Sequence, residues 1–321
     1  MNKTTKIFDF CRLGISSRNF KKHIAIILLI TAIIIAGCDD EEAPTGPSPY
    51  IGGNKGLIAE FEPMGIEESG IYTIFEDETF PIQVILKNKG EHNLGLGDVE
   101  ITIHGIPLID FTGISSQTLQ NAIKIEGVSE LNEEGGEEII NFGQEVRYAQ
   151  EVPGTFYDAN IFASYTYRYK TYASVPKVCF KENLRDERVC EVDESKEVYS
   201  SGAPIQVKSA RERPAGAGLI SLEFEIENVG GGKSTLPNQD FSPQYNQLAY
   251  TLEPANERNK WTCTAAGREN QARLIDDKAT IRCRLKAPLA ADTLYTKAIG
   301  LTLSYDYRDI LQETVRIKKT I

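Results

Sequence analysis

The stretch PIQVILKNKG at residues 81–90 reappears as SLEFEIENVG at residues 221–230, and the two share one pattern. In both, apolar and polar residues alternate and the run ends in Asn-x-Gly. A period of two puts one set of side chains in a core and the other in water, which is typical of a strand in an antiparallel sheet. Asn and Gly tolerate a positive φ, so each strand is predicted to end in a turn.

A second pair of segments repeats at the same displacement. SYTYR at 164–168 returns as SYDYR at 304–308, and both this pair and the strand pair are displaced by 140 residues. Two separated segments that share one offset indicate two copies of one domain. The tyrosines extend an apolar stripe, so we expect them in the core with their hydroxyls at the sheet edge. A ligand-facing aromatic patch is the alternative.

Short alternating runs separated by turn residues make up the chain from Gly56 onward, without a sustained helical period. Strands are expected at 57–61, 80–88, 99–104 and 157–169. The sequence therefore predicts an all-β fold with two tandem antiparallel β-sandwich domains. We name residues 56–180 copy 1 and residues 204–321 copy 2, and the charged segment between them, 181–203, the connector.

The N-terminus has the parts of a secretory signal. Residues 1–23 carry six Lys or Arg against one acid, and such positive charge stays on the cytoplasmic side. Residues 24–37 form an apolar run of 14 residues that ends in small side chains. As a helix this run is ~21 Å long, short of the ~30 Å of a hydrocarbon core, so it favours a signal peptide over a membrane span.

The residues IAGC at 35–38 close the apolar run. They resemble the lipobox of prokaryotic lipoprotein signal peptides, which implies removal of residues 1–37 and a lipid on the Cys38 thiol. An uncleaved N-terminal anchor helix is the alternative. Both interpretations place the rest of the chain on the extracytoplasmic side of the cell membrane. Residues 38–55 are acidic and then rich in Pro and Gly, so we expect a flexible tether there.

The alternating strand that ends in Asn-x-Gly, in tandem copies on an exported acidic chain, resembles the Ig-like modules of prokaryotic surface proteins. Among these modules it resembles the CARDB adhesion-related type. The resemblance implies an Ig-like, Greek-key arrangement of the strands. It rests on the quoted segments, which many sandwich families share, so it concerns the fold far more than the function.

The chain is acidic once the signal peptide is set aside. Without residues 1–37, which hold six of the 35 basic and one of the 46 acidic residues, the formal charge is −16. A surface this acidic argues against nucleic acid as a partner, because binding phosphates needs clustered Lys and Arg. Such a net charge ordinarily serves to keep a protein soluble, because copies of it repel one another.

Cysteine usage fits an oxidising compartment. Cys11 lies in the signal peptide and Cys38 is the predicted lipid site, which leaves an even number: Cys179, Cys190, Cys263 and Cys283. Three pairings can be drawn, and closeness in sequence favours Cys179–Cys190 and Cys263–Cys283 as disulfides. No Cys-x-x-Cys motif or Cys/His cluster in the sequence predicts zinc.

The sequence predicts no catalytic residue, no metal and no cofactor. Two histidines, His92 and His104, follow the signal peptide, and neither is paired by sequence with a nucleophile. Two acidic stretches, 76–78 and 130–138, contain the oxygen ligands that calcium uses. They lack a regular Asp spacing, so we expect them to be solvated turns.

These features predict a membrane-anchored extracytoplasmic lipoprotein that is a structural or adhesive binding module rather than an enzyme. Its expected partners are the membrane, through the N-terminal lipid or anchor, and a protein or polysaccharide surface. A scaffold subunit of an envelope or secretion assembly is the alternative. An envelope hydrolase is a third interpretation, and it would need paired carboxylates that converge in a cleft.

Replacing Cys38 tests the lipid site. We expect Cys38→Ser to abolish lipid labelling and to leave the precursor uncut, because serine lacks the thiol that takes the diacylglycerol. Metabolic labelling with a radioactive fatty acid, followed by a gel that separates precursor from mature chain, measures both effects. Cys11→Ser should change neither. Unchanged labelling of the Cys38→Ser chain would contradict the lipobox.

Overall fold

The structure, a computed structural model, describes residues 48–186, 188–242 and 244–320. Cys38, the signal peptide and most of the predicted tether lie outside these residues. The described chain consists of strands and the loops between them, apart from one 3-10 turn, η1 (Leu108–Asp110), and one short helix, α2 (Ala255–Arg258). The prediction of an all-β fold is confirmed. In this part of the chain no helix is long and apolar enough to cross a membrane.

Each copy builds one antiparallel sheet of its own. Copy 1 has the order β1-β4-β8-β6, with β1 (Leu57–Phe61), β4 (Phe80–Asn88), β8 (Glu137–Tyr148) and β6 (Phe111–Thr112). Copy 2 and the end of the connector have the order β10-β12-β13-β19-β16-β17, with β10 (Glu194–Lys196), β12 (Ile205–Gly216), β13 (Leu219–Asn228), β19 (Lys278–Leu285), β16 (Trp261–Ala265) and β17 (Arg268–Glu269). The repeated strands β4 and β13 occupy corresponding inner places in the two sheets.

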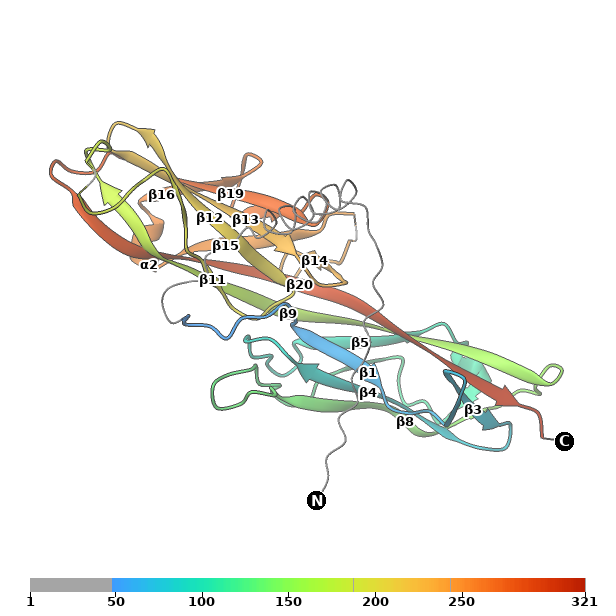
Figure 1. Cartoon of the computed structure of the whole chain (residues 1–321). Coiled ribbons are helices and arrows are strands. Elements are labelled where there is room, and N and C mark those ends of the chain that lie inside the picture. The colour runs from blue at the N-terminus through green and yellow to red at the C-terminus, as the bar shows by residue number, and fades with distance from the viewer. Residues whose placement is uncertain (1–47, 187, 243, 321) are drawn as a thin grey trace, which may run out of the picture. The chain divides into compact units, whose positions relative to one another are not determined.

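A third sheet takes strands from both copies, in the order β18-β15-β20-β9-β5-β7. These are β18 (Gln271–Arg273), β15 (Gln247–Glu253), β20 (Leu294–Lys318), β9 (Phe156–Lys181), β5 (Val99–His104) and β7 (Thr118–Gln120). Four short strands join its margins: β2 (Ile66–Glu68), β3 (Ile71–Phe75), β11 (Tyr199–Ser200) and β14 (Lys233–Thr235). We call this the shared sheet. Figure 1 shows green β9 and red β20 side by side along their length.

Alternate burial explains the repeated strand. Every second residue is buried from Phe80 to Asn88 in β4 and from Ile220 to Asn228 in β13. The apolar members of both sets join the hydrophobic core, whereas the polar residues between them are at least partly exposed. The period of two in the sequence therefore reports a strand with one face in the core.

The pairing of β9 with β20 relates the two copies by a local twofold axis. The antiparallel register puts Tyr167 opposite Tyr307, and these two residues are equivalent in the repeat. On one side of this pair Arg168 lies opposite Asp306, and on the other Arg308 lies opposite Thr166. A pair of equivalent residues in antiparallel register lies on a local twofold axis. Each long strand therefore starts in one copy and continues beside the strand of the other copy, in the same way for both.

The far half of each long strand adds to the part of the shared sheet that belongs to the other copy. β5 pairs with β9 through residues 162–167, and β15 pairs with β20 through residues 300–304. Beyond the axis, β20 continues along the start of β9, where Val315 and Ile317 are fully buried. β9 continues along the start of β20, and its Phe180 ring lies 6.0 Å from that of the single tryptophan. The described residues accordingly belong to one compact unit, in which the two sequence repeats share a sheet.

The Asn-x-Gly that ends each repeated strand binds a buried tyrosine. Asn228 Oδ1 accepts hydrogen bonds from the Tyr307 hydroxyl at 2.8 Å and from the Gly230 N–H at 3.3 Å. A Cβ on Gly230 would overlap that hydroxyl. Asn88 and Gly90 form a similar arrangement in copy 1 with the hydroxyl of Tyr169, two residues after Tyr167, the equivalent of Tyr307. None of these Asn and Gly residues has a positive φ, so the predicted reason for the motif is wrong: the close approach of the tyrosine requires the glycine.

The repeated tyrosines lie in the core, as the sequence predicts. None of the four is more than 5% exposed: Tyr165, Tyr167, Tyr305 and Tyr307. The hydroxyls of Tyr305 and Tyr307, expected at the sheet edge, are instead held by buried partners, Thr171 and Asn228. The alternative of an aromatic patch that faces a ligand is therefore wrong for these residues.

The described end of the predicted tether is bound to the folded part. Glu91 accepts hydrogen bonds from the N–H of Gly52 at 2.9 Å and from that of Gly202 at 2.5 Å. Gln206 Nε2 donates to the carbonyl oxygen of Gly53 at 2.9 Å. One carboxylate thus joins the N-terminal segment to the connector, so the free part of any tether ends before these residues.

Because the end of β20 packs in copy 1, a substitution near the C-terminus is predicted to destabilise copy 1. We expect Ile317→Ala to lower the free energy of unfolding by about 2–5 kcal/mol, because it leaves a cavity in the core. Amide hydrogen exchange should then accelerate more in β4 and β5 than in β13 and β15. Phe180→Ala, on β9, is the reciprocal variant and should accelerate exchange in β13 and β15 instead. Acceleration confined to copy 2 in the Ile317→Ala chain would contradict this packing.

Candidate functional site

Both predicted disulfides are present. The sulfur atoms of Cys179 and Cys190 are 2.01 Å apart, and those of Cys263 and Cys283 are 2.06 Å apart. The second bridge joins directly opposite residues of β16 and β19, on the strand that also carries buried Trp261. The first ties the connector to the end of β9, in the half of that strand that completes copy 2.

A buried carboxylate lies beside the first disulfide. Glu212 Oε2 accepts a hydrogen bond from the Cys179 N–H at 2.9 Å and pairs with Lys196 Nζ at 3.1 Å. Its Oε1 has no hydrogen-bond partner among the described residues. Burial raises the pKa of Glu212 to about 7, although the N–H of Cys179 and the Lys196 charge favour the ionised form. Near neutral pH this group therefore changes charge inside the fold.

The two histidines have different surroundings. His92 lies against the rings of Tyr169 and Tyr172, with its Nδ1 3.0 Å from the Tyr172 hydroxyl, and burial lowers its pKa to about 4. His104 is exposed, and its Nε2 lies 3.0 Å from Ser164 Oγ, a pair that sequence reasoning missed. Within the described chain no carboxylate binds Nδ1 of His104, so the pair lacks the group that orients the histidine of a catalytic triad.

The two acidic stretches bind backbone groups of their own fold. Glu78 Oε2 accepts a hydrogen bond from the N–H of Phe75 at 2.8 Å. Glu138 accepts those of Ala122 and Ile123 at 2.7 and 3.3 Å. Among the residues that the structure describes, no three His, Cys, Asp or Glu side chains are grouped so as to hold a metal ion.

Copy 2 carries an insertion relative to copy 1. Ile103 lies opposite Ala163, and Tyr250 lies opposite Leu303, which is the equivalent of Ala163 at the offset of 140. The offset from 103 to 250 is 147, so the link between β13 and β15 is seven residues longer than the link between β4 and β5. We call this longer link, 229–246, the insertion loop. It contains β14.

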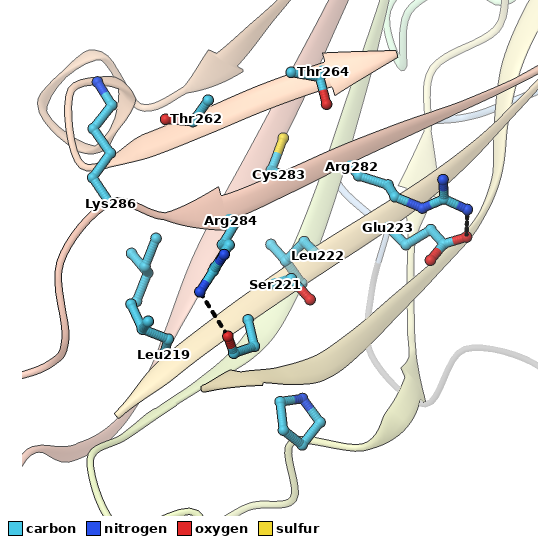
Figure 2. A pocket seen from close by; sticks show the side chains of 13 residues that line it. Leu219, Ser221, Leu222, Glu223, Thr262, Thr264, Arg282, Cys283, Arg284 and Lys286 are labelled. Carbon is cyan, nitrogen blue, oxygen red and sulfur yellow. Dashed lines mark hydrogen bonds and ion pairs between the residues drawn. The ribbon is translucent and has the colours of Figure 1, made fainter. Parts of the chain in front are cut away.

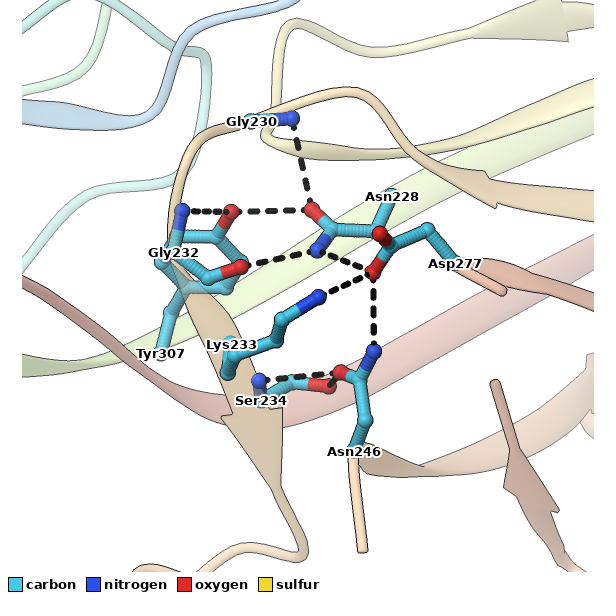
Figure 3. A network of polar contacts seen from close by, with 8 residues as sticks. All are labelled: Asn228, Gly230, Gly232, Lys233, Ser234, Asn246, Asp277 and Tyr307. Atoms are coloured by element: carbon cyan, nitrogen blue, oxygen red, sulfur yellow. Dashed lines mark hydrogen bonds and ion pairs between the residues drawn. The ribbon is translucent and has the colours of Figure 1, made fainter. Parts of the chain in front are cut away.

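Asp277 fixes the base of the insertion loop (Figure 3). Its Oδ1 accepts hydrogen bonds from Lys233 Nζ at 2.7 Å and from Asn246 Nδ2 at 3.0 Å. Asn228 Nδ2 adds a third at 3.2 Å, and Asn246 Oδ1 accepts from the Ser234 hydroxyl at 3.0 Å. The hydrogen bond from Lys233 lowers the pKa of Asp277, which keeps this carboxylate charged. Both ends of the loop are thus joined to one side chain.

The middle of the insertion loop lies on the outer face of the shared sheet. Asn238 N–H donates to Asp306 Oδ2 at 2.9 Å, and Arg168 Nη2 donates to Asn238 Oδ1 at 2.5 Å. The guanidinium carbon of Arg308 lies 4.2 Å from the ring centre of Phe241. Because Arg168 and Arg308 are equivalent in the repeat and lie on opposite sides of the local twofold axis, the loop crosses this axis and binds residues of both copies.

A groove follows the shared sheet beside Phe241. Its larger part has a volume of about 700 Å³, and a smaller hollow of about 280 Å³ shares Phe241 and Arg308 in its wall. Along β9 the first takes in Phe162 and Ser164 and the second Thr166 and Arg168, so the two hollows succeed one another. We call them together the junction groove, defined by His104, Phe162, Ser164, Phe241, Arg308 and Ile310.

Another hollow, of about 790 Å³, lies over β12, β13, β16 and β19 of copy 2 (Figure 2). Its arginines have partners within the sheet: Arg282 Nη2 lies 3.2 Å from Glu223 Oε1, and Arg284 Nη2 donates to the carbonyl oxygen of Ala215 at 2.9 Å. This is the solvent-facing side of an antiparallel sheet, which is polar as a rule. The junction groove is the stronger candidate, because its wall includes the longer link of copy 2 and its floor takes residues from both copies.

The chain matches no known protein family, and no curated protein matches it. Function therefore has to be argued from the geometry of the site.

The buried carboxyl of Glu212 predicts how stability depends on pH. Between its usual pKa of 4.5 and the folded value of about 7, the folded state binds more protons than the unfolded state. The contribution of Glu212 to stability is thus complete below the lower value and is lost as the pH rises through the upper one.

Glu212→Gln removes this titration. Relative to the parent chain, we expect the variant to gain about 2–3 kcal/mol in free energy of unfolding between pH 4.5 and pH 8. Chemical unfolding curves recorded across this range measure the gain. Glu225→Gln, at an exposed position on neighbouring β13, is the control and should give no such trend. Parallel pH profiles for the parent and the Glu212→Gln chain would contradict the assignment.

Proposed function

We propose that this protein is an exported, membrane-anchored binding module without catalytic activity, and that the junction groove holds its ligand outside the membrane. One observation carries the proposal. The seven-residue insertion builds the wall of the groove, and copy 1 forms the same strands without it. A segment that the fold does not need, fixed by Asp277 over the sheet, is best explained by binding.

The groove is held in shape before any ligand arrives. Its floor comes from β5 and β9 of copy 1 and from β20 of copy 2, which are neighbours in one ladder. Its wall is fixed through Asn238 to Arg168 and Asp306. A preformed site loses less conformational entropy on binding than a mobile one, which suits a protein whose task is to hold a partner.

The side chains of the groove favour binding over catalysis. His104 and Ser164 form its one histidine–serine pair among the described residues, and no carboxylate orients the histidine. A nucleophilic serine depends on such a chain of hydrogen bonds. The membrane anchor at Cys38 and the extracytoplasmic location belong to the same proposal and are supported by the sequence of the leader.

Photo-cross-linking on intact cells tests this function. We expect the full chain with Gln239→p-benzoylphenylalanine to capture envelope material on irradiation, because Gln239 lines the smaller hollow beside Phe241. The same photoreactive residue in place of exposed Lys278, on β19, is the control and should capture nothing recurrent. Recurrent capture of one protein would favour the scaffold alternative. No capture from Gln239 would overturn the proposal.

A further inference from the structure

Strand β9 in the floor of the junction groove offers no backbone groups to a ligand. β9 is paired with β5 on one edge and with β20 on the other, and β20 is paired in turn with β14 and β15. Extended peptides are captured mainly by adding a strand to a free sheet edge, where unpaired N–H and C=O groups are available. A ligand that lies over β9 has to be held by side chains, which disfavours an extended peptide there.

The side chains that line the groove combine apolar rings with neutral polar groups. Phe162 and Phe241 are half-buried, and Ile310 is 61% exposed. The His104–Ser164 pair and the Gln239 amide lie along the same track. A sugar ring has an apolar face of C–H groups that packs on an aromatic ring, and a rim of hydroxyls that hydrogen-bond to amides, imidazole and hydroxyls.

The cations of the groove are already engaged within the protein. Arg168 Nε lies 3.5 Å from Asp306 Oδ1, and Lys233 pairs with Asp277. Arg308 donates to Thr166 Oγ1 at 2.7 Å and stacks on Phe241. Glu100, Asp240 and Asp309 also line the two hollows, and, like Arg308, none of the three makes an ion pair among the described residues, so the carboxylates without an ion pair outnumber such cations in the lining. An anionic ligand would meet uncompensated carboxylates and would be repelled.

Resting on the proposed function, we propose that the ligand of the junction groove is a neutral polysaccharide chain. The hollows of about 700 and 280 Å³ succeed one another along β9 on either side of the Arg308–Phe241 stack, and they take neighbouring sugar units. Phe241 contacts both hollows, so its ring packs against the sugar units that occupy them.

Affinity electrophoresis of the full chain, solubilised from membranes in mild detergent, tests the ligand class. Native gels would contain dextran, mannan, xylan or a mixed-linkage β-glucan, with alginate and polygalacturonate as anionic counterparts. We expect retardation by at least one neutral polymer and by neither anionic one. Phe241→Ala should weaken that retardation at least about tenfold, whereas Phe241→Tyr, which keeps the ring, should retain it.

A matched control comes from the same chain. Phe156 also stacks on an arginine, with the Arg316 guanidinium carbon 4.2 Å from its ring centre, and it does not line the junction groove. Phe156→Ala should therefore leave retardation unchanged, which separates loss of the groove from loss of a surface stack. Thermal melts of the two alanine variants verify that both are folded.

Three results would overturn the glycan assignment: retardation by no neutral polymer, retardation by anionic polymers alone, or equal retardation of the parent and Phe241→Ala chains. The assignment and the proposed function fail separately. Capture of a protein from Gln239 without retardation by any neutral polymer would remove the glycan and leave the binding module. Failure to capture anything from Gln239, together with no retardation, would remove both.

Discussion

The antiparallel ladder between β9 and β20 holds the two sequence repeats in one structure. On one side of the Tyr167–Tyr307 pair each of these strands packs in its own copy, and on the other side it packs in the other copy. Separating them would expose unpaired backbone groups along two sheet edges and would uncover core residues such as Val315 and Phe180. The copies therefore stabilise each other through main-chain hydrogen bonds and a common core, and the floor of the junction groove exists only while the ladder does.

The parts of this arrangement that depend on local sequence could be predicted. The strands expected at 57–61, 80–88 and 99–104 coincide with β1, β4 and β5. They could be predicted because the alternation of apolar and polar residues is a local property of the sequence. The disulfides followed from closeness in sequence. The strand expected at 157–169 is half of β9, since its second half is specified by pairing with residues of copy 2 far along the chain. The groove was missed for the same reason: His104 and Ser164 are 60 residues apart, and the insertion is measurable only once both registers are known.

Duplication gives the molecule two copies that share their strands and differ in the links between them: copy 2 has the longer link after the Asn-x-Gly turn, and copy 1 has the longer link between β5 and β8. The Asn-x-Gly turn is retained in both, and in each its glycine makes room for a tyrosine hydroxyl, which comes from Tyr169 in copy 1 and from Tyr307 in copy 2. Directly after that turn in copy 2 the chain lengthens, and Asp277 closes the added segment at its base. Both ends of the insertion loop are thus held by Asp277, so the loop can differ from its counterpart in copy 1 without a change in the sheet beneath it.

The crossing of the long strands also decides when the molecule can fold. A chain is made from its N-terminus onward, so the strands of copy 1 emerge first. Residues 308–318 of β20 pair with the start of β9, which belongs to copy 1. Because these residues lie near the C-terminus, the copy 1 part of the shared sheet stays incomplete until synthesis is almost finished. Until then copy 1 has an open edge and an uncovered core, the state in which β-proteins aggregate. Copy 1 therefore needs the end of copy 2 to complete its part of the shared sheet, and a chain that stops before β20 leaves its first half unfinished as well as its second.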